Sequence, residues 1–105
     1  MKYDKLVRDK IPNIIHESGK DCISFPAKEF EVINYLNKKV YEELKEFEEN
    51  PCIEEAADIL EILDAYFKKS IGFSYNSSTI KKAKRKKKKK VGAFKKNYIL
   101  HEVSD

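Results

Sequence analysis

The 105-residue chain has few of the residues on which the common catalytic and metal-binding motifs depend, with three glycines, two cysteines and two histidines. It contains no glycine-rich phosphate loop and no zinc-type spacing of cysteine and histidine, and neither His16 nor His101 belongs to a nucleophile–histidine arrangement. Cys22 and Cys52 also lack metal-ligand spacing, so we interpret both as free thiols in a reducing compartment. These absences argue against P-loop, zinc-finger and serine- or cysteine-hydrolase functions.

Long apolar runs are missing as well. No stretch approaches the roughly 20 apolar residues of a membrane span, and the first residues lack the apolar stretch of a signal peptide. We therefore expect a soluble, cytoplasmic protein without a membrane partner. A chain of 105 residues fits a single domain covering 1–105. Charged residues make up 38% of it, above the roughly 25% that is usual. The core of a monomer would be small, which favours an oligomer.

Positive charge is concentrated in one segment. The net charge of the chain is +4, but residues 81–90, KKAKRKKKKK, hold nine of the 22 bases, so the rest carries 13 bases against 18 acids. An acidic body with one basic segment suits a metal site beside a polyanion site, and it also suits a solvated tail. The segment could alternatively be a nucleic-acid binding module. The acidic body and the lack of aromatic residues within the run argue against a nucleic-acid partner.

Apolar periodicity predicts an all-α fold with two long antiparallel helices. The first is expected over 26–49 and the second over 52–70, because Asn50-Pro51 disfavours helical geometry between them. The stripe expected on the first helix comprises Phe30, Ile33, Asn37, Val40, Leu44 and Phe47. The main stripe expected on the second comprises Ile53, Ala56, Leu60, Leu63 and Phe67, beside a face with Glu55, Asp58, Ile62 and Tyr66.

Two further helices are expected. A short one begins at residue 9 or 11 and ends at 17, with Pro12 in its first turn. A third, basic helix runs through the lysine segment, capped by Ser77 or Ser78 and ended by Gly92. Residues 20–25 and 97–103 are the only strand candidates, and a minor two-stranded pairing of the two is the one β element we consider.

Acidic residues dominate 42–64, and two pairs there share one spacing: Glu43-x-x-Glu46 and Glu55-x-x-Asp58. Residues three apart lie on one face of a helix, so two helices joined at Asn50-Pro51 can direct four carboxylates into one space. Crowded carboxylates repel each other unless something neutralises them. Mg²⁺ takes oxygen ligands and usually carries substrate phosphates, so it fits that need. The competing interpretation is a solvated, glutamate-rich helix face, because such matches are common.

Bases near such a site are candidates for binding the phosphates of a substrate. They are Lys5, Arg8, Lys10, Lys84 and Arg85. The first three also fit a plain surface arm that docks through its aliphatic neighbours. A spare carboxylate could act as general base, and the sequence does not say which.

Three motifs, taken in order, resemble a known family. Residues 5–12, KLVRDKIP, resemble the opening of a subgroup of the MazG-like nucleotide pyrophosphohydrolases, relatives of phosphoribosyl-ATP pyrophosphohydrolase. The acidic pairs resemble that family's E-x-x-E…E-x-x-D signature. The basic segment with Gly92-Ala93-Phe94 resembles its K/R-rich segment and R-G-G-F. Val91 and Ala93 stand where that last pattern has arginine and glycine.

The resemblance implies an all-α MazG-like helical bundle that forms a homodimer or homotetramer. It also implies Mg²⁺-dependent (or Mn²⁺-dependent) cleavage of a nucleoside triphosphate or related nucleotide to the monophosphate form and pyrophosphate. The catalytic metal ligands would be Glu43, Glu46, Glu55 and Asp58. Because Val91 and Ala93 depart from the pattern, a catalytically silent nucleotide-binding or assembly protein of the same fold stays open as an alternative.

Overall fold

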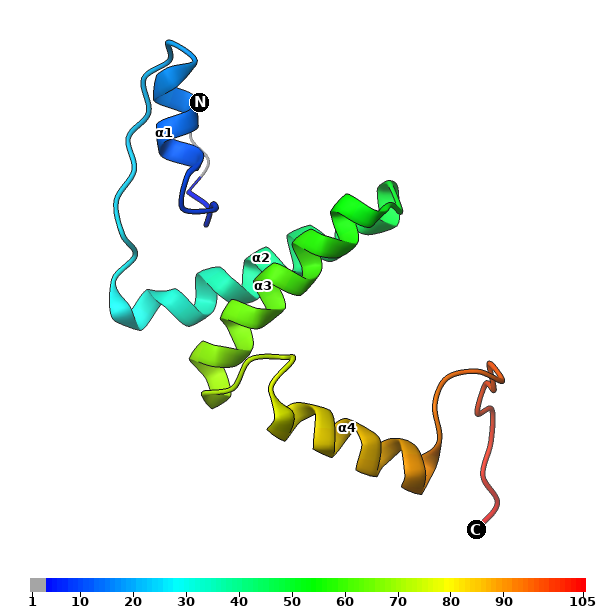
Figure 1. Ribbon diagram of the computed structural model, residues 1–105. Coiled ribbons are helices and arrows are strands. Elements are labelled where there is room, and N and C mark those ends of the chain that lie inside the picture. The colour runs from blue at the N-terminus through cyan, green and yellow to red at the C-terminus, as the bar shows by residue number, and fades with distance from the viewer. Residues whose placement is uncertain (1–3) are drawn as a thin grey trace.

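The computed structural model describes residues 4–105, and within this range the chain forms four α-helices and no β-strand (Figure 1). They are α1 (Ile11–Glu17), α2 (Glu29–Glu49), α3 (Ile53–Ile71) and α4 (Ser78–Val91). The prediction of an all-α fold is confirmed, and each helix begins and ends within about three residues of its expected bounds. None of these four helices has both the length and the apolar character of a membrane span.

Helices α2 and α3 form an antiparallel hairpin and lie side by side in Figure 1. Only three residues, 50–52, connect them, and Asn50 and Cys52 both have non-helical backbone angles. Pro51 accounts for the break, because it restricts Asn50 to an extended conformation and offers no N–H to continue α2. Among residues 4–105, α2 and α3 are the only helices that pack against each other.

The interface between α2 and α3 is small and partly polar. Leu36 is the one buried apolar residue of the described range, with 5% of its surface exposed, and Glu43 is the one buried charged residue, with 7% exposed. They lie seven residues apart, on one face of α2. Asn37, the polar residue of the expected stripe, donates from Nδ2 to the Tyr66 hydroxyl of α3 at 3.0 Å. The stripe prediction therefore missed Leu36, whereas its polar member joins the two helices.

The short helix α1 begins next to the N-terminal arm, which we define as residues 4–10. Pro12 occupies the first turn, where its missing N–H would have had no helical partner. Gly19 follows the helix with a φ of +86°, a conformation that favours glycine. The arm contacts the hairpin through two bases, Lys5 and Arg8.

Helix α4 is set apart from the hairpin (Figure 1). Gly72 ends α3 in the left-handed conformation, with a φ of +80°. The hydroxyl of Ser77 caps α4 by accepting from the Ile80 N–H at 3.2 Å, which decides between the two expected caps. Gly92 follows the last residue of the helix, as expected.

The expected strand pairing is wrong. Residues 20–25 and 97–103 contain no strand, and apart from the half-buried Cys22 their side chains are exposed, for example Ile23 at 95% and Tyr98 at 85%. A two-stranded pair needs support from a packed surface, and neither segment lies on the hairpin. Short alternating patterns without such support do not produce a strand here.

The chain is far more extended than a compact monomer. Its radius of gyration is 18.3 Å, whereas a compact chain of this length has a radius of about 13 Å. Large apolar side chains are exposed on both long helices, including Phe30, Tyr41, Ile53 and Ile71. A single copy therefore leaves large apolar side chains of both long helices uncovered.

Candidate metal centre

Three carboxylates meet where α2 packs against α3. Glu43 comes from α2, and Glu55 and Asp58 come from α3. One oxygen of each lies within 4.8 Å of the others. Glu43 is buried, and the other two are half-buried. The expected E-x-x-D pair of α3 is therefore brought to the buried glutamate of α2.

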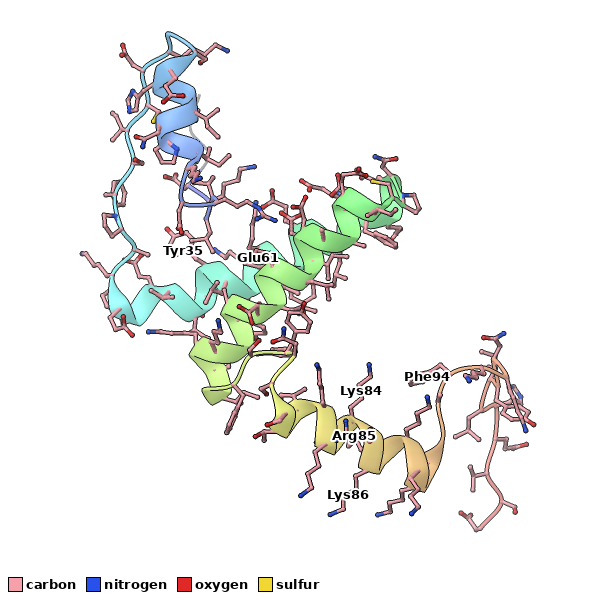
Figure 2. All side chains as sticks on the ribbon, viewed as in Figure 1. Tyr35, Glu61, Lys84, Arg85, Lys86 and Phe94 are labelled. Atoms are coloured by element: carbon pink, nitrogen blue, oxygen red, sulfur yellow. The ribbon has the colours of Figure 1, made fainter. Side chains whose placement is uncertain are left out.

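A second group of carboxylates shares Glu43. Its members are Glu42, Glu43 and Glu46, and one oxygen of each lies within 4.8 Å of the others. Of the four predicted ligands, three thus lie together, and Glu46 joins them only through its neighbour Glu43. Two other glutamates of α3, Glu54 and Glu61, are exposed and belong to neither group; Figure 2 labels Glu61.

Three bases contact these two groups of carboxylates. Lys39 Nζ lies 3.2 Å from Glu42 Oε1 and 3.3 Å from Glu43 Oε1. Lys5 Nζ lies 3.2 Å from Glu42 Oε1. Arg8 donates to Asp58 Oδ1 at 2.7 Å. Five carboxylates against three bases leave two negative charges in excess, which is the charge of one divalent cation.

Burial and these contacts shift the pKa values in opposite directions. Burial raises the pKa of Glu43, and the nearby charge of Glu46 adds to this, while Lys39 only partly offsets it. Burial also acts to raise the pKa of Glu42, but hydrogen bonds from Lys5 and Lys39 lower it overall. Burial acts to lower the pKa of Lys39, but Glu42 and Glu43 raise it overall. The fold therefore disfavours the charged form of Glu43 and favours that of Glu42.

Two buried oxygens of the centre have no hydrogen-bond partner within the described residues. They are Glu43 Oε2 and Glu55 Oε2, one from each long helix. A buried, unpaired carboxylate oxygen is destabilising, and native structures normally satisfy such atoms with protein, water or an ion. The donor set, made of carboxylate oxygens alone, suits Mg²⁺ or Mn²⁺ and not a soft metal. The residues present thus fit a hard divalent cation.

The chain has no match among protein-family models, curated proteins or solved structures. The function of the centre is therefore inferred from its residues and their geometry.

The predicted phosphate-binding residues fall into two sets. Lys5 and Arg8 lie beside the carboxylates, as described above. Lys10 is exposed and precedes α1. Lys84 and Arg85 lie on α4 (Figure 2). With Lys81 and Lys88 they line an open hollow of about 260 Å³ formed by that helix alone. Within one chain, α4 does not contact the hairpin that carries the centre.

Two residues of the centre were not predicted, Lys39 and Glu42. A signal for Lys39 was present in the sequence, because it precedes Glu42 by three residues and Glu43 by four. Residues at those spacings are neighbours on a helix, and opposite charges there attract. Glu42 was not predicted because the E-x-x-E pattern begins one residue later, at Glu43.

Proposed function

We propose that the protein is a Mg²⁺-dependent nucleotide pyrophosphohydrolase of the MazG-like, house-cleaning type. It would hydrolyse a nucleoside triphosphate or related nucleotide to the monophosphate form and pyrophosphate. The observation that carries the proposal is the pair of buried, unpartnered oxygens of Glu43 and Glu55, in a centre with two uncompensated negative charges. The order of motifs along the sequence supports the same assignment.

In this proposal Glu43, Glu55 and Asp58 hold the cation, and Glu46 lies next to it through Glu43. The bound cation would neutralise phosphate charge and make the phosphorus a better electrophile. Arg8 and Lys5 would bind the phosphates of the substrate beside the cation. Arg8 lies 2.7 Å from Asp58, and its side chain is 56% exposed, so its remaining N–H groups can bind a phosphate held at the centre. Mn²⁺ would replace Mg²⁺ without a change of ligands.

We also propose that the active protein is a homodimer or homotetramer. The support is the extended shape of one chain and the exposed apolar side chains of α2 and α3. A second copy would cover these faces and would bring basic residues from another chain near the centre. Size-exclusion chromatography with light scattering tests this directly, and a monomer at micromolar concentration would contradict it.

The function is tested by measuring pyrophosphate release from a panel of canonical and modified nucleotides, with Mg²⁺ or Mn²⁺. We expect turnover by the wild type, a loss of at least about 100-fold in Glu43→Gln and Asp58→Asn, and normal turnover in Glu48→Gln. Glu48 is the matched control, because it is an exposed glutamate of α2 outside both carboxylate groups. No turnover of any nucleotide with either metal would remove the enzymatic assignment.

The three bases at the centre favour one competing function, a catalytically silent nucleotide binder whose carboxylates are partly neutralised by Lys39, Lys5 and Arg8. This alternative predicts nucleotide binding in EDTA that Arg8→Gln weakens. The hydrolase predicts nucleotide binding that requires Mg²⁺ and is followed by turnover. Calorimetric titration of a non-hydrolysable triphosphate, with and without Mg²⁺, distinguishes the two.

A further inference from the structure

Helix α4 carries nine bases and no acidic residue in 14 residues. Every residue from 81 to 90 is exposed. None of the nine bases forms an ion pair with an acidic side chain of residues 4–105, whereas Lys5 and Arg8 of the arm, Lys39 of α2, and Lys68 and Lys69 of α3 each do. The helix also makes no packing contact with another helix of this range. The concentrated positive charge of α4 is therefore balanced neither by ion pairs nor by packing within the described residues.

Such a helix is poorly stable by itself. Isolated helices of about 12–15 residues are marginal in water even with favourable sequences. The bases form five like-charge pairs at i,i+4 and six at i,i+3, and each pair destabilises a helix by about 0.2–0.5 kcal/mol. The sum is about 2–5 kcal/mol. A ligand with many negative charges would relieve this repulsion along the whole helix.

The positions of the bases favour one kind of polyanion. At about 100° per residue, seven of the nine bases cover one broad side of α4, and Figure 2 shows Lys84 and Lys86 on opposite sides of the helix. The remaining strip holds only Thr79, Ile80, Ala83 and Val91 besides lysine. A membrane-surface helix needs a wide apolar face with large side chains, which α4 lacks. A single-strand site needs aromatic residues for stacking, and the helix has none.

We propose that α4 binds duplex DNA through its phosphates, without reading the base sequence. A helix of 14 residues is about 21 Å long, and a DNA duplex presents about 12 phosphate charges over that length. The major groove is about 12 Å wide and admits an α-helix with phosphates on both of its sides. The major groove of duplex RNA is too narrow for this. Lysines supply charge without the paired donors that recognise a base, and Arg85 is the one arginine of the helix.

The acidic character of the body led us to expect no nucleic-acid partner, and the placement of α4 leads us to revise that expectation. The carboxylate centre lies on the hairpin, whereas α4 leads away from it (Figure 1). DNA held along α4 would therefore not have to approach the centre closely. The proposal is independent of the proposed hydrolase, since either can fail without the other.

The test uses the full-length protein and a fluorescein-labelled 24-base-pair DNA duplex in EDTA, followed by anisotropy between 50 and 200 mM KCl. With about six phosphate contacts, we expect log K against log[KCl] to have a slope of about −5, so affinity falls roughly 10³-fold over this range. A four-lysine variant carries Lys82→Gln, Lys86→Gln, Lys89→Gln and Lys90→Gln together. For this variant we expect a slope of about −2, and at 50 mM KCl an affinity at least about tenfold weaker than that of the wild type. These four lysines share one side of α4 and exclude the predicted substrate-binding residues.

The matched control changes four exposed lysines outside α4 to glutamine, Lys20, Lys28, Lys38 and Lys45. It alters the net charge by the same amount, and we expect it to keep the wild-type slope. Equal weakening in both variants would overturn the proposal, because net charge alone would then explain binding. Equal affinity for duplex RNA, single-stranded DNA or vesicles of anionic lipid would also overturn it, as would the absence of binding at 50 mM KCl. Circular dichroism should show that the four-lysine variant is at least as helical as the wild type, because the substitutions remove like-charge pairs.

Discussion

Neutralising Glu43 should stabilise the metal-free protein and abolish its stabilisation by Mg²⁺. At an effective dielectric constant of about 20, two charges 4.8 Å apart repel by about 3.5 kcal/mol. At that separation Glu55 and Asp58 together oppose the charge of Glu43 by about 7 kcal/mol, and Glu46 adds to this repulsion, against about 5 kcal/mol of attraction to Lys39 at 3.3 Å. Asp58 is paired with Arg8 and 38% exposed, so screening reduces the difference of about 2 kcal/mol to about 1 kcal/mol.

The assay is thermal unfolding of Glu43→Gln beside the wild type and Glu48→Gln. A gain of about 1 kcal/mol in the free energy of unfolding corresponds to a Tm higher by about 4–8 °C in a domain of this size. Millimolar Mg²⁺ should raise the Tm of the wild type and of Glu48→Gln, because a ligand that binds only the folded state stabilises it. It should leave the Tm of Glu43→Gln unchanged.

The pH dependence provides a second check. The folded-state pKa of Glu43 is raised above the ordinary value of 4.5. Its contribution to stability is therefore fully present below pH 4.5 and is lost as the pH rises through the folded-state pKa. The advantage of Glu43→Gln should thus be largest at neutral pH and vanish in acid. If metal-free Glu43→Gln melts below the wild type at pH 7, the charge of Glu43 is well compensated within the protein, and the case for a cation is lost.

Three further predictions concern the scaffold. Hydrogen bonds from Ser74 and Lys68 lower the pKa of Asp64, so Asp64→Asn should lower the Tm at pH 7. The difference in Tm between variant and wild type should disappear as the pH falls through the folded-state pKa of Asp64, and a difference independent of pH would contradict this. Tyr66→Phe should destabilise the protein by about 1–2 kcal/mol in urea unfolding, because it removes the hydroxyl that accepts from the half-buried Asn37 amide. Adding Asn37→Ala to Tyr66→Phe should cause little further loss, because the two residues share one hydrogen bond. Ser77→Ala should weaken α4 by about 1 kcal/mol, seen as faster hydrogen exchange confined to that helix, whereas a global loss of protection would show that α4 is coupled to the hairpin.

The sequence was sufficient to predict the helices, because their start and stop signals are local. Pro51 separates α2 from α3, and Gly72 and Gly92 follow the last residues of α3 and α4. These residues act through their own backbone geometry, so no tertiary context is needed.

The packing face of each helix was harder to predict. A glutamate, Glu43, is buried deep in the interface, while the apolar Leu60 of the expected stripe stays 44% exposed. Apolar periodicity assumes that the buried face is the apolar one, and a polar centre between two helices violates that assumption. The spacing of the acidic pairs predicted one group of Glu43, Glu46, Glu55 and Asp58, and all of these except Glu46 lie together. The arm that brings Arg8 to Asp58 depends on a contact between distant parts of the chain.

The three-residue connection between the long helices has a kinetic consequence. Closing so short a loop takes well under a microsecond, and chains dominated by nearby contacts fold fast. The carboxylates therefore converge at an early step of folding, before the basic arm at the N-terminus can dock. During that interval the acidic side chains attract dissolved cations without competition from Arg8 and Lys5. A stopped-flow experiment should accordingly show refolding that accelerates with magnesium concentration in the wild type and does not in Glu43→Gln.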